Sequence, residues 1–157
     1  ERGLFRPLWS ADILDELARN LTEAGIGEES VSRLIGEMSG AFVDAEVGGY
    51  HSLIDSMACD PKDRHVLAAA VRADAGAIVT FNVADFPDAA VLEYELDVIH
   101  PDDFLMDVLD LAPRVVLGEL ALQAAANRRE PKTVALLLDV LERSGVPTFV
   151  DEVRRRT

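Results

Sequence analysis

The feature that most constrains the fold is a helical segment that passes directly into a short apolar strand. Residues 60–74 carry apolar side chains at helical spacing, and Asp60 and Pro61 suit the N-cap and the first helical position. Gly76 is a residue type that commonly ends a helix. The run at 77–81 (A-I-V-T-F) is apolar and rich in β-branched residues, which predicts a buried strand. The chain is therefore expected to be an α/β protein.

A second strand is predicted at residues 96–100 (L-D-V-I-H), after a loop and a short helix that follows Pro87. The order helix, strand, helix, strand indicates a parallel sheet joined by crossover helices. A sheet of two strands is marginal by itself. The pattern therefore implies strands beyond the two that can be identified.

Helices are predicted on both sides of this α/β segment. Two precede it, and beyond Pro101 the pattern becomes purely helical. The helical tail is expected to be an extension packed on the α/β body. The predicted ranges are 10–21 and 28–42 before the segment, and 104–109, 113–128, 133–144 and 147–155 after it.

The chain is strongly acidic, with 15 Lys and Arg against 29 Asp and Glu and a formal net charge of −14. Such a field repels a polyanion such as RNA. Two interpretations remain open. In one, the acids form a solvated, solubilising surface. In the other, some of them converge on a metal ion, which locally reverses the sign of the field.

Cysteine content and hydropathy indicate a cytoplasmic protein. The single cysteine, Cys59, cannot form an internal disulfide, which fits a reducing compartment. No apolar run approaches the roughly 20 residues that a membrane-spanning helix needs. We therefore expect no membrane partner.

Four acids stand out by their positions. Glu16 lies on the first helix, Asp60 and Asp63 share one face at the start of the 60–74 helix, and Asp85 lies in the loop after the first strand. Helix N-termini favour ionised carboxylates, and loops at the carboxyl ends of parallel strands commonly carry sites. Oxygen ligands suit Mg²⁺ or Mn²⁺. By spacing alone, however, the solvated-surface interpretation is favoured, and Asp15 could equally be the exposed acid of the pair that it forms with Glu16.

A resemblance changes that balance. The motifs D-P-K-D-R-H-V-L-A-A-A and V-T-F-N-V-A-D-F-P, within residues 60–87, closely resemble the core signature of the PIN-domain family, particularly its branch of VapC-like toxins. The segment W-S-A-D-I-L-D-E-L is similar to the family segment that carries a helical glutamate. Residues 100–111 resemble the helical tail of one subfamily. The resemblance covers nearly the whole chain.

The resemblance implies a fold and a domain division. The expected fold is a Rossmann-like three-layer α/β/α sandwich with a central parallel sheet and a C-terminal helical extension. Residues 1–100 would form the PIN-like domain, and residues 101–157 the appended helices. The family begins with a strand that ends in an aspartate, and nothing in this sequence matches it. We therefore expect the PIN-like domain to lack its first strand.

The resemblance also implies the site. Glu16, Asp63 and Asp85 match the family's catalytic acids, which hold one or two Mg²⁺ or Mn²⁺ ions. Asp60 matches an additional metal-binding acid of this branch. Thr80 and Asn82 match polar residues beside the site.

The function implied is that of a metal-dependent endoribonuclease, the toxin of a toxin–antitoxin pair. Its partners would be an RNA such as tRNA, a cognate antitoxin protein and a second copy of the chain in a homodimer. Local cations such as Lys62, Arg64 and Arg72 would help RNA to reach an acidic protein. The alternative is a non-catalytic PIN-like interaction module that lacks the first metal-binding acid.

Overall fold

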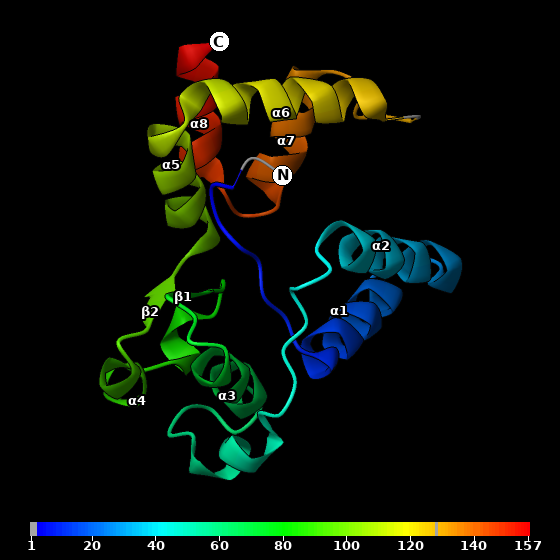
Figure 1. Ribbon diagram of the computed structural model, residues 1–157. Coiled ribbons are helices and arrows are strands. Elements are labelled where there is room, and N and C mark those ends of the chain that lie inside the picture. Colours follow the sequence, from blue (N-terminus) through cyan, green and yellow to red (C-terminus); the bar gives the residue numbers. More distant parts are fainter. Residues whose placement is uncertain (1–2, 128) are drawn as a thin grey trace. The chain divides into compact units, whose positions relative to one another are not determined.

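The computed structural model describes residues 3–127 and 129–157. Within these ranges the chain is mostly helical and contains one small sheet (Figure 1). The α-helices are α1 Ala11–Glu23, α2 Glu28–Ala41, α3 Arg64–Arg72, α4 Asp88–Val91, α5 Pro101–Leu111, α6 Pro113–Ala126, α7 Val134–Arg143 and α8 Pro147–Arg156. Three short 3₁₀ helices, η1 His51–Ser56, η2 Val83–Asp85 and η3 Leu92–Tyr94, and two strands, β1 Ala77–Val79 and β2 Asp97–Ile99, complete the description.

The two strands lie side by side in a parallel sheet, as the order of elements predicts. The Thr80 N–H donates to the Ile99 carbonyl over 3.0 Å, and the Asp97 N–H donates to the Gly76 carbonyl over 3.1 Å. In the described part of the chain this sheet has two strands. The prediction of an α/β chain with a parallel strand pair and a C-terminal helical region is therefore confirmed.

The structure divides into two compact units, which are described separately. The first contains Phe5–Ile78 and Asn82–Val98. The second contains Val79–Phe81 and Ile99–Thr157, together with residues 3–4. No described helix combines the length and the apolar character that crossing a membrane requires.

Helix α3 is the centre of the first unit. Leu67 and the alanines that follow it are buried and pack with Ile78 of β1. The helix begins at Arg64, so the predicted start at Asp60 was wrong. The Asp60 carboxylate instead accepts the Lys62 N–H over 3.0 Å, and the Asp63 N–H donates to the Asp60 carbonyl, which closes a turn before the helix.

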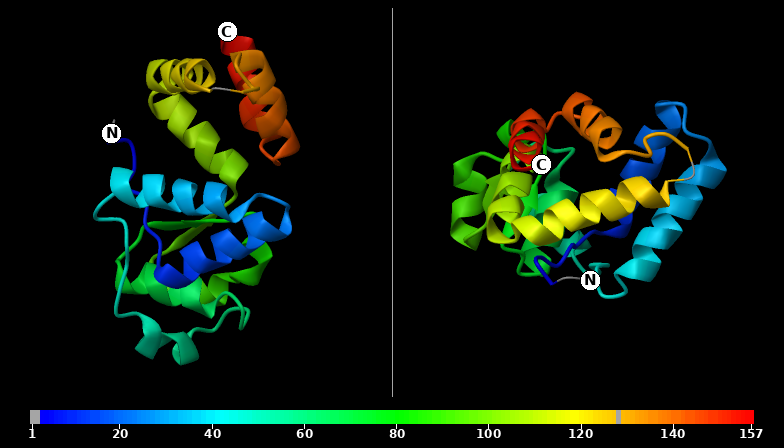
Figure 2. Two further views of the ribbon diagram at one scale, coloured as in Figure 1. Left: turned by 90° about the vertical axis from the view of Figure 1, so that its right-hand side faces the viewer. Right: turned by 90° about the horizontal axis from the view of Figure 1, so that it is seen from above.

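Helices α1 and α2 pack against each other in the first unit (Figures 1 and 2). Ser10 is fully buried, and its hydroxyl accepts the Ile13 N–H over 3.3 Å, so that it caps α1 as predicted. The buried Tyr50 hydroxyl donates to the Asp12 carboxylate over 2.7 Å. These contacts fix the first turn of α1 and therefore the position of Glu16 one turn later.

The second unit is built from α5 to α8 around its own apolar core. Leu109, Phe149, Val150 and Val153 are almost completely buried in it. The predicted helix 113–128 ends at Ala126, and its expected last residue, Arg128, lies outside the described residues.

The three arginines at the end of α8 are engaged in ion pairs with nearby acids. Arg154 pairs with Asp139 and Glu142, and Arg156 pairs with Asp110. Arg155 pairs with Glu152. This basic run therefore neutralises acids of its own unit.

Candidate metal site

Asp63 stands at the amino end of α3, in the position of an N-cap residue. Its backbone carbonyl accepts the N–H groups of Val66 and Leu67, but its side chain makes no capping hydrogen bond. An aspartate at this position commonly uses its carboxylate as the cap. The Asp63 carboxylate instead lies in the favourable field of the helix N-terminus without being used in that way.

The loop after β1 is joined to the turn before α3. The Asp60 N–H donates to the Asp85 carbonyl over 3.2 Å, and the Asp85 N–H donates to the Asn82 carbonyl over 3.0 Å. The first bond brings Asp85 to Asp60, although 25 positions separate them in the printed sequence. One oxygen of Asp60 is already occupied by the Lys62 N–H.

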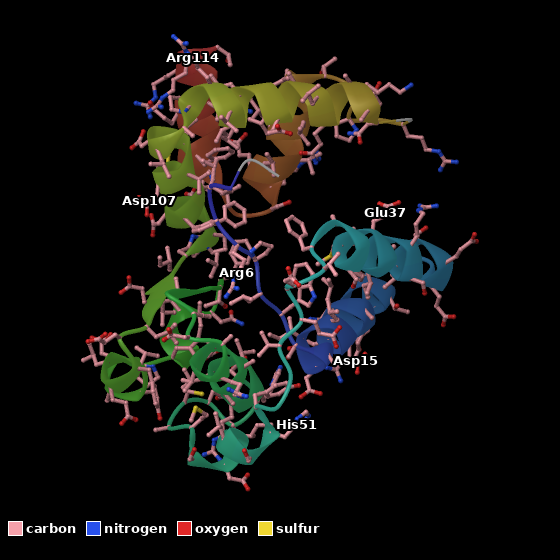
Figure 3. The ribbon with its side chains drawn as sticks, viewed as in Figure 1. Arg6, Asp15, Glu37, His51, Asp107 and Arg114 are labelled. Atoms are coloured by element: carbon pink, nitrogen blue, oxygen red, sulfur yellow. The ribbon has the colours of Figure 1, made fainter. Side chains whose placement is uncertain are left out.

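Glu16 reaches the same region from α1. Its carboxylate Oε2 lies 3.6 Å from Nε2 of His65 on α3. The Glu16 side chain is 43% exposed, whereas its neighbour Asp15 points to solvent (Figure 3). The structure therefore separates the two acids that the sequence left interchangeable.

The other three acids act electrostatically on Asp63. Partial burial, followed by the negative charges of Asp85, Asp60 and Glu16, raises the pKa of Asp63 above its ordinary value, and His65 partly offsets this effect. The side chains nevertheless do not meet closely enough to form a metal-binding group, since the described residues contain no set of three His, Cys, Asp or Glu with that geometry. The acids form a loose cluster of like charges, which a divalent cation would relieve.

The remaining predicted residues lie on the chain that leaves β1. Thr80 follows the strand and donates its backbone N–H to Ile99, and Asn82 precedes η2. Asn82 belongs to the same unit as the four acids, whereas Thr80 belongs to the helical unit.

His65 of α3 also lies near the acids. It faces Glu16, and its Nδ1 lies 2.8 Å from the Lys62 carbonyl. In the sequence, only its position two residues after Asp63 indicates that His65 lies near the acids.

Comparison of the sequence with known protein families gives two matches. The PIN-domain family profile matches residues 1–84, and the profile of the VapC50 C-terminal domain matches residues 101–155. The chain belongs to the PIN-domain family. Nucleases of this family typically use divalent metal ions.

The chain is also similar to a protein of Mycobacterium tuberculosis named "Putative ribonuclease VapC50". The two are 45% identical over 107 residues, which cover 68% of this chain and 63% of that protein. The chain thus matches less than two thirds of the length of this relative. No solved structure matches the chain.

Proposed function

We propose that this protein is a Mg²⁺- or Mn²⁺-dependent endoribonuclease and the toxin of a toxin–antitoxin pair. The observation that carries the proposal is the electrostatic grouping of Glu16, Asp60 and Asp85 around Asp63 in a PIN-domain chain. The printed name of the similar mycobacterial protein, "Putative ribonuclease VapC50", supports the same activity.

In this proposal Glu16, Asp63 and Asp85 would hold the ion. Asp60 would contribute through the oxygen that does not accept the Lys62 N–H. An oxygen-only donor set fits a hard divalent cation, and Mg²⁺ needs few protein ligands because it keeps several waters. When bound, such an ion supplies Lewis-acid activation of a water and positive charge at the scissile phosphate.

The residues around these acids would orient the RNA. Lys62 and Arg64 flank Asp63 at the positive end of α3, where phosphate groups are favoured, whereas Arg72 lies in the last turn of that helix, at the end opposite Asp63. Asn82, in the same unit as the acids, would add a hydrogen bond beside the scissile bond, and the resemblance implies the same role for Thr80. A single-stranded or looped segment of a structured RNA such as tRNA would be the substrate class.

The proposal also includes the domain division, the localisation and the protein partners. Residues 1–100 would form a PIN-like α/β/α sandwich around a central parallel sheet, and residues 101–157 its helical extension. We expect a cytoplasmic protein that forms a homodimer and binds a cognate antitoxin. The similarity to a VapC50 protein supports the expectation of an antitoxin partner.

Cleavage assays with the full chain test the proposal. Purified protein is incubated with tRNA and with unstructured RNA in Mg²⁺, Mn²⁺ or EDTA. We expect cleavage that EDTA abolishes and that Asp63→Ala lowers by at least about 100-fold. The control Asp88→Ala changes an exposed acid at the start of α4 and should leave the rate unchanged. Cleavage that survives Asp63→Ala or EDTA would contradict a metal-dependent nuclease.

A non-catalytic PIN-like interaction module is the second candidate. The observation that favours it is that the described acids do not converge into a metal-binding group. It predicts no cleavage in any metal, and cellular toxicity that is the same with and without Asp63→Ala.

A further inference from the structure

Tyr50 is a buried residue whose hydroxyl reaches helix α1. It is 1% exposed, and its hydroxyl donates to the Asp12 carboxylate over 2.7 Å. Burial raises the pKa of Tyr50 above its ordinary value, so the hydroxyl keeps its proton at neutral pH. An O–H donor and an ionised acceptor form one of the stronger kinds of hydrogen bond in proteins. The bond therefore ties the first turn of α1 to the segment before η1.

The Tyr50 ring is itself held in place. It belongs to the apolar core that also contains Leu67 of α3. It stacks on the His51 ring, with 4.3 Å between the ring centroids. His51 Nε2 lies 3.9 Å from the same Asp12 carboxylate, which exceeds hydrogen-bond range, and the His51 side chain is mostly exposed. Tyr50 thus connects α1 to the core around α3.

Helix α1 has few other restraints on its rotation about its own axis. It packs against α2, but none of its residues, all of which are described, is buried. The backbone of Trp9 bonds to Ala45 and Val47, and Ser10 caps the helix at Ile13. These contacts fix where the helix begins. A side-chain bond to one face of the helix resists rotation in addition.

Asp12 and Glu16 lie four residues apart on α1 and therefore on the same face. A bond that fixes the direction of Asp12 consequently fixes that of Glu16 as well. We infer that Tyr50 is a positioning residue, which holds this face of α1 toward α3 and so directs Glu16 to the acids around Asp63. The inference rests on the proposed metal-dependent function for its purpose, whereas the hold on α1 can be tested without metal.

Amide hydrogen exchange in the metal-free full chain tests the hold on α1. Tyr50→Phe keeps the buried ring, and the Asp12 side chain, which is 44% exposed, can bind water instead. We expect the amides of α1 to exchange about tenfold faster in this variant and those of α3 to change by less than about twofold. Tyr94→Phe removes the same atom from the other of the two tyrosines in the chain and should leave α1 unchanged.

The dependence on Asp12 separates this role from a general structural one. In the Asp12→Ala chain, Tyr50→Phe should cause no further change in the exchange of α1. Exchange in α1 that stays unchanged in Tyr50→Phe, or that rises equally in α1 and α3, would overturn the inference. The same effect of Tyr50→Phe with and without Asp12 would also overturn it.

Mn²⁺ titration calorimetry tests the consequence for Glu16. We expect Tyr50→Phe to weaken Mn²⁺ binding about fivefold when Glu16 is present, and to have no further effect in the Glu16→Gln background. Tyr94→Phe should leave the affinity within about twofold. Equal weakening in both backgrounds would show that Tyr50 does not act through Glu16 and would overturn the inference. If the unmodified chain binds no Mn²⁺, the proposed function fails, whereas hydrogen exchange still decides whether Tyr50 holds α1.

Discussion

The Asp102 carboxylate of α5 accepts the backbone N–H of Phe149, in the first turn of α8, over 2.8 Å. It also accepts the Thr148 N–H over 3.0 Å. The residue before α8, Val146, provides no side-chain cap. Asp102 therefore caps α8 from a neighbouring helix and satisfies two N–H groups that the helix cannot satisfy itself.

Asp102→Asn should destabilise the helical unit by about 1–2 kcal/mol. The amide has one oxygen where the carboxylate has two, so one of the two N–H groups would lose its partner in a buried site. Urea unfolding followed by circular dichroism at pH 7 measures the effect. Asp103→Asn, an exposed acid next to it, serves as the control and should change the stability by less than about 0.5 kcal/mol.

The same contact predicts a loss of stability in acid. Burial raises the pKa of Asp102, but the hydrogen bonds from Phe149 and Thr148 outweigh it, and the net pKa is lowered. An acid whose pKa is lower in the folded state contributes stability above its unfolded pKa of about 4. That contribution is lost as the pH falls through the folded pKa. Unfolding at pH 7 and pH 3 should therefore show a smaller pH effect in Asp102→Asn than in the unmodified chain.

Asp63→Asn should stabilise the metal-free protein by about 0.5 kcal/mol. Burial and the charges of Asp85, Asp60 and Glu16 raise the pKa of Asp63, so the folded state disfavours its ionised form at neutral pH. In saturating Mn²⁺ the unmodified chain should become the more stable of the two proteins. A ligand at about 100 times its Kd stabilises the protein that binds it by about 2.7 kcal/mol. Thermal unfolding with and without Mn²⁺ measures both effects. A metal-free Asp63→Asn protein less stable than the original would show that Asp63 is mainly structural.

Gly145→Ala should destabilise the helical unit by about 1–3 kcal/mol. Gly145 follows α7 with a φ of +98°, and a Cβ there would lie 3.0 Å from the Phe81 ring. The matched control is Gly118→Ala in the interior of α6, where nothing lies within 4 Å of an added Cβ. That change should stabilise the unit by about 0.5–1 kcal/mol. Equal effects of the two substitutions on stability would contradict a requirement for glycine at position 145.

The helices and strands could be predicted from the sequence because capping and helix-ending residues act on neighbouring positions in the chain. Ser10 caps α1, in agreement with its residue type, whereas α3 ends at Arg72 and the left-handed position after it is taken by Asp74, not by Gly76. The start of α3 was misplaced because Asp60 and Pro61 also suit a turn. The Asp60 side chain bonds to Lys62 two residues on, which shifts the helix start to Arg64.

Contacts between distant segments could not be predicted in the same way. The Asp60–Asp85 backbone bond, the approach of His65 to Glu16 and the capping of α8 by Asp102 all join residues from different elements. Periodicity describes one element at a time and carries no information on which faces meet. Position alone singled out the four acids, but only the family resemblance favoured their grouping over a solvated surface.

Mn²⁺ titration of single variants tests most directly whether three carboxylates share one cation. Calorimetry compares the unmodified chain with Glu16→Gln, Asp63→Asn and Asp85→Asn, and with the exposed controls Asp15→Asn and Asp88→Asn. We predict that each of the first three weakens Mn²⁺ binding by at least about tenfold and that the controls stay within about twofold. Unchanged affinity in any two of the three variants, or no binding by the unmodified chain, would contradict a shared site.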